Sequence, residues 1–114
     1  EKLFVKVIDC ADPHYKKMLL ETECDVLILN HLHMWARDLL DEGMEEEKIQ
    51  TTILSWIKSN PDAIVICDEL GNGIVPIKKQ ERIWREQTGR LMIELAKQAE
   101  RVERILCGLG QRLK

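Results

Sequence analysis

The sequence lacks the long apolar run of a membrane-spanning protein and the surplus of basic residues of a nucleic-acid-binding protein. No stretch of its 114 residues approaches the roughly 18 consecutive apolar residues of a membrane span. The net charge of -3 gives no basic footprint for nucleic acid, so a nucleic-acid partner is not expected. The first residues form no signal-peptide pattern either. These absences predict a cytoplasmic protein without a membrane span.

Paired cysteines are missing as well. Cys10, Cys24, Cys67 and Cys107 include no C-x-x-C pair, and each lies in or beside an apolar run. Free cysteine is among the most buried residue types, so we expect small buried thiols rather than a zinc site or a disulfide framework. Cysteine used in this way fits a reducing compartment.

Two signatures of catalysis are also absent. A phosphate-binding loop of the form G-x-x-x-x-G-K-[ST] needs a Gly-Lys pair, and the sequence contains none. No Ser or Cys stands in the context of a nucleophile elbow. What is present is the composition of a soluble globular protein, 45% hydrophobic and 32% charged. We expect residues 1–114 to form a single domain.

Apolar stretches of strand length alternate with helical patterns along the chain. Strands are predicted at Leu3 to Asp9, at Asp25 to Asn30, at Ala63 to Cys67, and near Ile105 to Cys107. Capping signals and helical spacing predict helices near Tyr15, from His31 to Leu40, from Glu45 to Ser59, and from Lys78 to Arg101. The alternation implies right-handed crossovers. The predicted fold class is α/β, a three-layer domain with a parallel sheet of about four strands and helices on both faces.

The segment after the third predicted strand is the strongest candidate for a site. Asp68 and Glu69 form a carboxylate pair there, and Gly71 and Gly73 permit backbone conformations that other residues avoid. Ligands of parallel α/β sheets bind outside the carboxyl ends of the strands, which is where this loop is expected. The pair could bind a metal or a ribose or act as a base. Before any comparison with known families, a solvated turn or a cap of the next helix is the preferred interpretation.

Histidines and a helix glycine form two weaker candidates. His31 and His33 would share one face of a strand but diverge in a helix, and with His14 they could form a three-histidine metal site. Surface or loop histidines at a strand end are the preferred interpretation. Gly89 interrupts the longest helix at a cost of about 1 kcal/mol relative to alanine. Close packing of helix on sheet is the preferred explanation, and the alternative is that Gly89 and Arg90 let an anion or a partner chain approach.

Four stretches carry a resemblance to a known family. They run from Asn30 to Trp35 with Asp38 to Leu40 after it, from Asp68 to Pro76, from Thr88 to Ala96, and from Cys107 to Lys114. Their order resembles that of the bifunctional adenosylcobinamide kinase/adenosylcobinamide-phosphate guanylyltransferase family of cobalamin biosynthesis. The second stretch, D-E-L-G-N-G-I-V-P, is the most specific, because the family's strand ends in N-E-V-G-x-G-I-V-P.

The resemblance implies a P-loop-kinase-like (RecA-like) fold, GTP or ATP with Mg as cofactors, a nucleotide or corrinoid ligand, and a homo-oligomer, a trimer in the family. The ligand-binding candidates that it carries over are Asn30, Asp68, Glu69, Gly71, Gly73 and Arg90. No catalytic residue and no metal ligand carries over.

Departures from the family pattern change the expected activity. The family's phosphate loop and its guanylyl-accepting histidine segment are absent, and Asn30 replaces a family aspartate. We therefore expect a truncated member that binds without kinase turnover. The alternative is a non-catalytic oligomeric scaffold or a regulatory partner of a full-length enzyme. A fragment of a longer kinase is disfavoured, because the histidine segment is missing internally as well.

Overall fold

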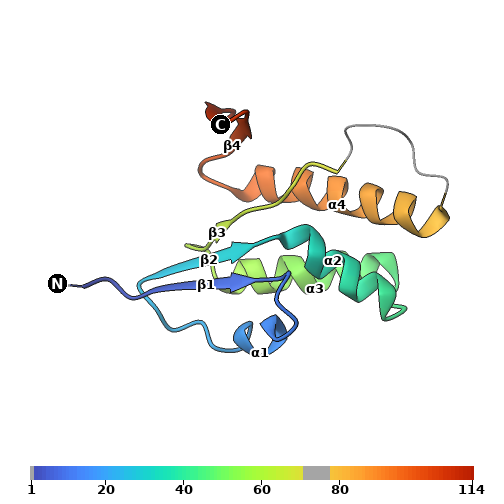
Figure 1. Ribbon diagram of the computed structural model, residues 1–114, viewed down its shortest axis with the longest axis horizontal. Helices are drawn as coiled ribbons and strands as arrows, with labels where there is room; N and C mark the ends of the chain where they lie inside the picture. Colours follow the sequence, from blue (N-terminus) through green and yellow to red (C-terminus); the bar gives the residue numbers. More distant parts are fainter. Residues whose placement is uncertain (1, 71–77) are drawn as a thin grey trace.

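Three parallel strands form the centre of the fold, and helices pack around them (Figure 1). The computed structural model describes residues 2–70 and 78–114. Gly71, Gly73 and Pro76 therefore lie outside the described residues. The elements in chain order are β1 (Val5–Asp9), α1 (Tyr15–Met18), β2 (Val26–Asn30), α2 (Leu32–Asp41), α3 (Glu46–Ser59), β3 (Ile64–Val65), α4 (Lys79–Gln98), β4 (Glu103–Leu106) and β5 (Leu109–Arg112).

The sheet has the order β1-β2-β3, and both of its ladders are parallel. Val7 lies opposite Ile28, which lies opposite Ile64, and Asp9 lies opposite Asn30 at the end of the first ladder. The strands therefore finish at a common edge, where their following residues come together. The predicted α/β class with a parallel sheet and surrounding helices is confirmed.

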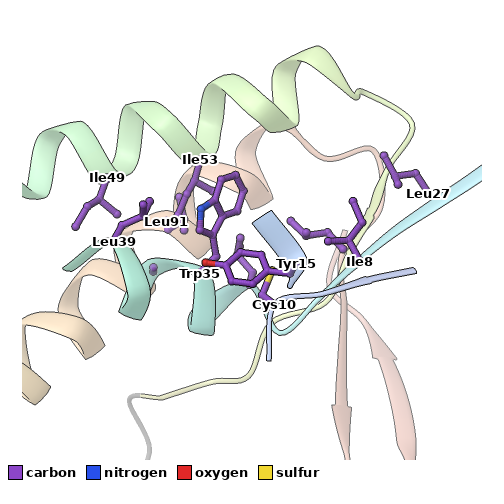
Figure 2. Close-up of a cluster of buried hydrophobic side chains, with 12 residues drawn as sticks. Ile8, Cys10, Tyr15, Leu27, Trp35, Leu39, Ile49, Ile53 and Leu91 are labelled. Carbon is purple, nitrogen blue, oxygen red and sulfur yellow. The ribbon is translucent and has the colours of Figure 1, made fainter. Parts of the chain in front are cut away.

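The core lies on one face of the sheet and continues between the helices (Figure 2). The alternation of the strands places Ile8, Leu27 and Leu29 on this face, where all three are buried. The other buried apolar side chains come mainly from the helices and are Cys10 after β1, Tyr15 of α1, Leu32, Trp35, Ala36 and Leu39 of α2, Ile49 and Ile53 of α3, and Leu91 of α4. The spacing of three or four residues within α2 and within α3 gives each of these two helices one apolar stripe. On the other face of the sheet, the side chains of β1 and β3 are about half exposed.

A glycine follows the end of α2, a helix that the sequence predicted to end at Leu40. Gly43 has a φ of +85°, in the left-handed region that favours glycine. Its N–H donates to the carbonyl of Leu40 at 3.0 Å, and the N–H of Met44 donates to that of Leu39 at 3.1 Å. These two bonds form a Schellman motif, which satisfies carbonyls that the helix itself leaves open. The chain can then turn sharply into α3.

The last predicted strand is present but does not join the parallel sheet. β4 pairs antiparallel with β5 to form a separate two-stranded sheet, so the expectation of about four parallel strands is wrong. The turn explains the difference, because Cys107 and Gly108 have φ values of 52° and 77°. Positive φ at both central residues is typical of a two-residue type I′ hairpin turn. Cys107 is consequently exposed, contrary to the expectation of a buried thiol.

Candidate functional site

Four side chains meet at the edge where the parallel strands end. Asp9 ends β1, His31 follows β2, His33 lies in the first turn of α2, and Asp68 lies on the segment that follows β3. The imidazole rings of His31 and His33 are 5.6 Å apart between centroids and nearly perpendicular. Each ring contacts a carboxylate of a neighbouring element. We call these four residues the strand-end cluster.

Asp9 and His31 join the ends of the first two strands. The Nδ1 of His31 lies 2.6 Å from the Oδ1 of Asp9, and this bond lowers the pKa of the Asp9 carboxyl below its usual value. His31 has a φ of 56°, which is uncommon outside glycine although histidine is among the residues that adopt it. Its backbone N–H donates to the Oδ1 of Asn30 at 3.0 Å. Asp9 and Asn30 thus hold His31 in this conformation.

His33 joins α2 to the segment after β3. The backbone N–H of Asp68 donates to its Nδ1 at 3.2 Å, which leaves the ring proton on Nε2, 3.5 Å from the Oδ2 of Asp68. Burial lowers the pKa of His33 and favours the neutral ring. The carbonyl of His33 also accepts a hydrogen bond of 2.8 Å from the indole N–H of Trp84. His33 is therefore a fixed, neutral link between three elements.

The sequence suggested a three-histidine metal site, and the structure does not assemble one. Among residues 2–70 and 78–114, no three His, Cys, Asp or Glu side chains are placed to hold a metal ion. His14 lies before α1, where its backbone N–H donates to Asp12. The two imidazole–carboxylate pairs of the strand-end cluster can instead form hydrogen bonds with a bound hydroxyl or amine and exchange protons with it.

The predicted ligand-binding residues fall in two places. Asn30 and Asp68 both lie at the strand ends, although the amide oxygen of Asn30 accepts the N–H of its own neighbour. Glu69 follows directly and accepts a bond of 2.8 Å from the guanidinium of Arg104 on β4. Arg90 lies at a different cavity. It lines a cavity of about 340 Å³ between α3 and α4 and pairs with Glu86 at 3.7 Å.

Sequence reasoning missed Asp9 as a member of the site. The available signal was its position as the last residue of a predicted strand, because parallel strands end at the same edge. The two cysteines near this edge are unsuited to nucleophilic attack, since burial raises the pKa of Cys10 to about 12 and that of Cys67 to about 11. Both thiols stay protonated at neutral pH.

Gly89 borders a second cavity rather than a tight helix contact. A Cβ built on Gly89 meets no described atom within 4 Å, so packing within the described chain does not require glycine there. The preferred explanation of close helix-on-sheet packing is therefore wrong. The cavity measures about 260 Å³ and is lined by Glu69, Leu70, Arg85, Gly89 and Met92. We call it the Gly89 groove.

No helix within the described residues is both long enough and apolar enough to cross a membrane.

Comparisons with known proteins identify the family. The family model described as cobinamide kinase / cobinamide phosphate guanyltransferase matches residues 7–113. The bifunctional adenosylcobalamin biosynthesis protein CobU of Salmonella typhimurium is 27% identical over 85 residues, which cover 75% of this chain and 46% of that protein. Its Escherichia coli counterpart is 28% identical over 80 residues, covering 70% and 44%. The matched region thus spans less than half of each relative. Because the family model matches nearly the whole chain, the chain belongs to the cobinamide kinase / cobinamide phosphate guanyltransferase family.

Proposed function

We propose that this chain acts in cobalamin biosynthesis by binding a nucleotide or a corrinoid at the carboxyl edge of its sheet. The observation that carries the proposal is the position of Asp68 and Glu69. They follow β3, and Asp68 contacts His33 beside the ends of β1 and β2. Ligands of parallel α/β sheets bind at this edge, and the family acts on compounds of both classes. The strand-end cluster supplies acceptors and an imidazole N–H for the hydroxyls of such a ligand.

We expect these 114 residues to bind without transferring a phosphoryl group. The sequence has no Gly-Lys pair and hence no phosphate loop to hold a triphosphate. Asn30, which replaces the family aspartate at the end of β2, uses its amide oxygen to hold the N–H of His31. Phosphorylation of adenosylcobinamide by the purified chain would contradict this part of the proposal.

Isothermal titration calorimetry tests the binding itself. GTP, ATP, GMP and adenosylcobinamide are titrated into the full chain at concentrations up to the millimolar range of typical metabolite sites. We expect saturable heat with at least one of them. The absence of heat with all four would refute the proposal.

A matched pair of variants locates the site. Asp68→Asn removes a charge at the carboxyl end of β3 but leaves the backbone N–H that binds His33. Asp62→Asn removes the same charge at the amino end of β3, where Asp62 is exposed. We expect Asp68→Asn to weaken binding about tenfold, as loss of one charge-assisted hydrogen bond does, and Asp62→Asn to have no effect. Equal effects of the two variants would point to overall charge rather than to this site.

A second candidate function is a non-catalytic oligomeric scaffold or a regulatory partner of a full-length enzyme. It is favoured by apolar side chains that the described chain leaves exposed. Ile105 and Leu109, on the hairpin of β4 and β5, are each 75% exposed. An isolated two-stranded hairpin is marginally stable in water, so a hairpin that exposes such side chains gains stability from a covering surface.

Light scattering coupled to size-exclusion chromatography tests this second function. We expect a defined oligomer, and the family resemblance points to a trimer. Ile105→Gln should shift the chain toward a monomer, because it makes the exposed side chain of β4 polar. A monomer at all concentrations, with no association with a full-length family enzyme, would exclude the scaffold.

A further inference from the structure

The hairpin of β4 and β5 takes no part in the apolar core. Among the described residues, the buried cluster and the apolar side chains packed against it end at Leu95, before the hairpin begins. Figure 1 shows the hairpin beyond the C-terminal end of α4, and it forms a sheet of its own. Its side chains Ile105, Leu106 and Leu109 are 75%, 61% and 75% exposed. Apolar burial therefore contributes little to the placement of the hairpin on the rest of the chain.

Polar contacts attach the hairpin instead. The Nε–H of Arg104 on β4 donates to the Oε1 of Glu69 at 2.8 Å. The ammonium of Lys114, after β5, donates to the carbonyls of Ala96 at 2.9 Å and Lys97 at 3.1 Å. The contact of Lys114 is made with the last turn of α4, where carbonyls lack a partner within the helix. The contact of Arg104 reaches the segment that follows β3.

This segment is held from two sides at adjacent residues. The backbone N–H of Asp68 donates to the Nδ1 of His33 on α2, and the carboxylate of Glu69 accepts the bond from the hairpin. One rigid peptide unit joins Asp68 to Glu69, so a displacement of one residue changes the position of the other. The hairpin is therefore connected through Glu69 to the strand-end cluster.

The exposure of the Arg104–Glu69 pair limits its strength. The two side chains are 39% and 43% exposed. Because water screens such pairs, this contact favours the attached hairpin over a detached one by about fivefold at most. A ligand can shift an equilibrium of this size if it binds the two states with different affinities. The contact is thus strong enough to orient Glu69 and weak enough to respond to binding.

We propose that Arg104 is a positioning residue for the proposed ligand site: it holds Glu69 and so couples binding at the strand ends to attachment of the hairpin. This inference rests on the proposed function, which assigns Asp68 and Glu69 to the ligand. Coupling is reciprocal, so attachment should raise the affinity for ligand by the same factor by which the ligand favours attachment. The alternative is a surface ion pair that affects only its own two side chains.

Hydrogen exchange of the full chain tests the positioning role without any ligand. The reporter is the amide of Asp68, because it donates to His33. We expect Arg104→Gln to speed its exchange about two- to fivefold, and Arg104→Lys, which keeps the charge, to restore most of the protection. Arg101→Gln is the matched control, since Arg101 pairs with Glu103 of the hairpin itself at 3.2 Å, and it should change the exchange by less than about 1.5-fold. Equal effects of the two glutamine variants, or none in Arg104→Gln, would refute the positioning role.

A double-mutant cycle shows whether Arg104 acts through Glu69. Glu69→Gln should speed the exchange of the Asp68 amide as much as Arg104→Gln does, and the double variant should add nothing further. Effects that multiply in the double variant would mean that the two side chains act separately, and would contradict the inference.

Calorimetry measures the coupling to ligand. GTP, ATP, GMP and adenosylcobinamide are titrated into each variant. For every compound that binds the unmodified chain, we expect Arg104→Gln to weaken binding about two- to fivefold and Arg101→Gln to leave it unchanged. The same compound at saturation should shift the magnetic resonance signal of the Arg104 Nε–H. Unchanged affinity in Arg104→Gln would overturn the coupling.

The outcomes separate this inference from the proposed function. If none of the four compounds gives heat but Arg104→Gln still speeds exchange at Asp68, the proposed function fails and the attachment of the segment by Arg104 stands. If a compound binds, and Arg104→Gln changes neither its affinity nor the exchange at Asp68, the proposed function stands and Arg104 forms only a surface ion pair.

Discussion

Replacing Gly89 by alanine should make the protein more stable, although it adds an atom to a half-buried position. The change gives α4 a better helix former in its interior, which is worth about 1 kcal/mol. A clash would offset this gain, but the added Cβ meets no described atom within 4 Å. We therefore expect the free energy of unfolding to rise by nearly the full helix-propensity difference, about 0.5–1 kcal/mol.

Urea unfolding followed by tryptophan fluorescence measures this gain, because Trp35, Trp56 and Trp84 all lie in or against the core. At a typical slope of about 2 kcal/mol per molar urea, the midpoint should rise by about 0.3–0.5 M. The melting temperature should rise by about 4 °C for a chain of this size. The slope itself should not change, since neither folded nor unfolded state is remodelled.

Gly43→Ala is the matched control. A Cβ at Gly43 also meets no atom within 4 Å, but its φ of +85° is unfavourable for alanine. We expect this variant to lose about 1 kcal/mol, in the opposite direction from Gly89→Ala. If Gly89→Ala were neutral or destabilising while Gly43→Ala behaved as expected, something would contact α4 at Gly89 in solution, and the reasoning from open space would be refuted.

Three further predictions concern the core and the strand ends. Tyr15→Phe should lower the free energy of unfolding in urea by about 1.5–3 kcal/mol, because the buried hydroxyl donates to Asp38 at 2.7 Å; an unchanged midpoint would contradict this. Because burial lowers the pKa of His33 in the folded state, the unfolded state binds more protons just below pH 6.5. The free energy of unfolding should therefore fall as the pH drops from about 7.5 to 5.5. His33→Gln should flatten that dependence, because it removes both the titrating imidazole and its contact with Asp68. A disulfide-exchange reagent should modify one thiol rapidly in the native protein, and Cys107→Ser should abolish that phase, since Cys107 is the exposed cysteine of the described chain.

The strands of the sheet could be predicted because their burial leaves a simple apolar pattern. The run from Asp25 to Asn30 became β2, which lies between the other two strands. β3 is shorter than predicted, because the chain leaves the ladder after Val65. Ile66 still donates its N–H to the carbonyl of Leu29 at 2.8 Å and accepts the N–H of Leu32 at 3.1 Å. These bonds direct the following segment toward α2, which no local pattern reveals.

The strand-end cluster could be predicted only in part. The carboxyl-edge rule places Asn30 and Asp68 correctly, and it would have placed Asp9 had it been applied to the first strand. It could not predict that His31 adopts a left-handed conformation, because contacts with Asp9 and Asn30 hold it there. Nor could periodicity show that Asp68 selects the tautomer of His33 from a distance of 35 positions.

Gly89 shows why a residue that weakens local structure deserves a search for its contacts. Helix propensity alone makes glycine unfavourable at this position, and no close contact within the described chain requires it there. A natural sequence keeps such a residue most readily where a side chain would obstruct function, since stability and activity often oppose each other. The higher stability expected for Gly89→Ala follows from this one missing Cβ. Glu69, which Arg104 of β4 holds at 2.8 Å, lines the same groove as this open stretch of α4.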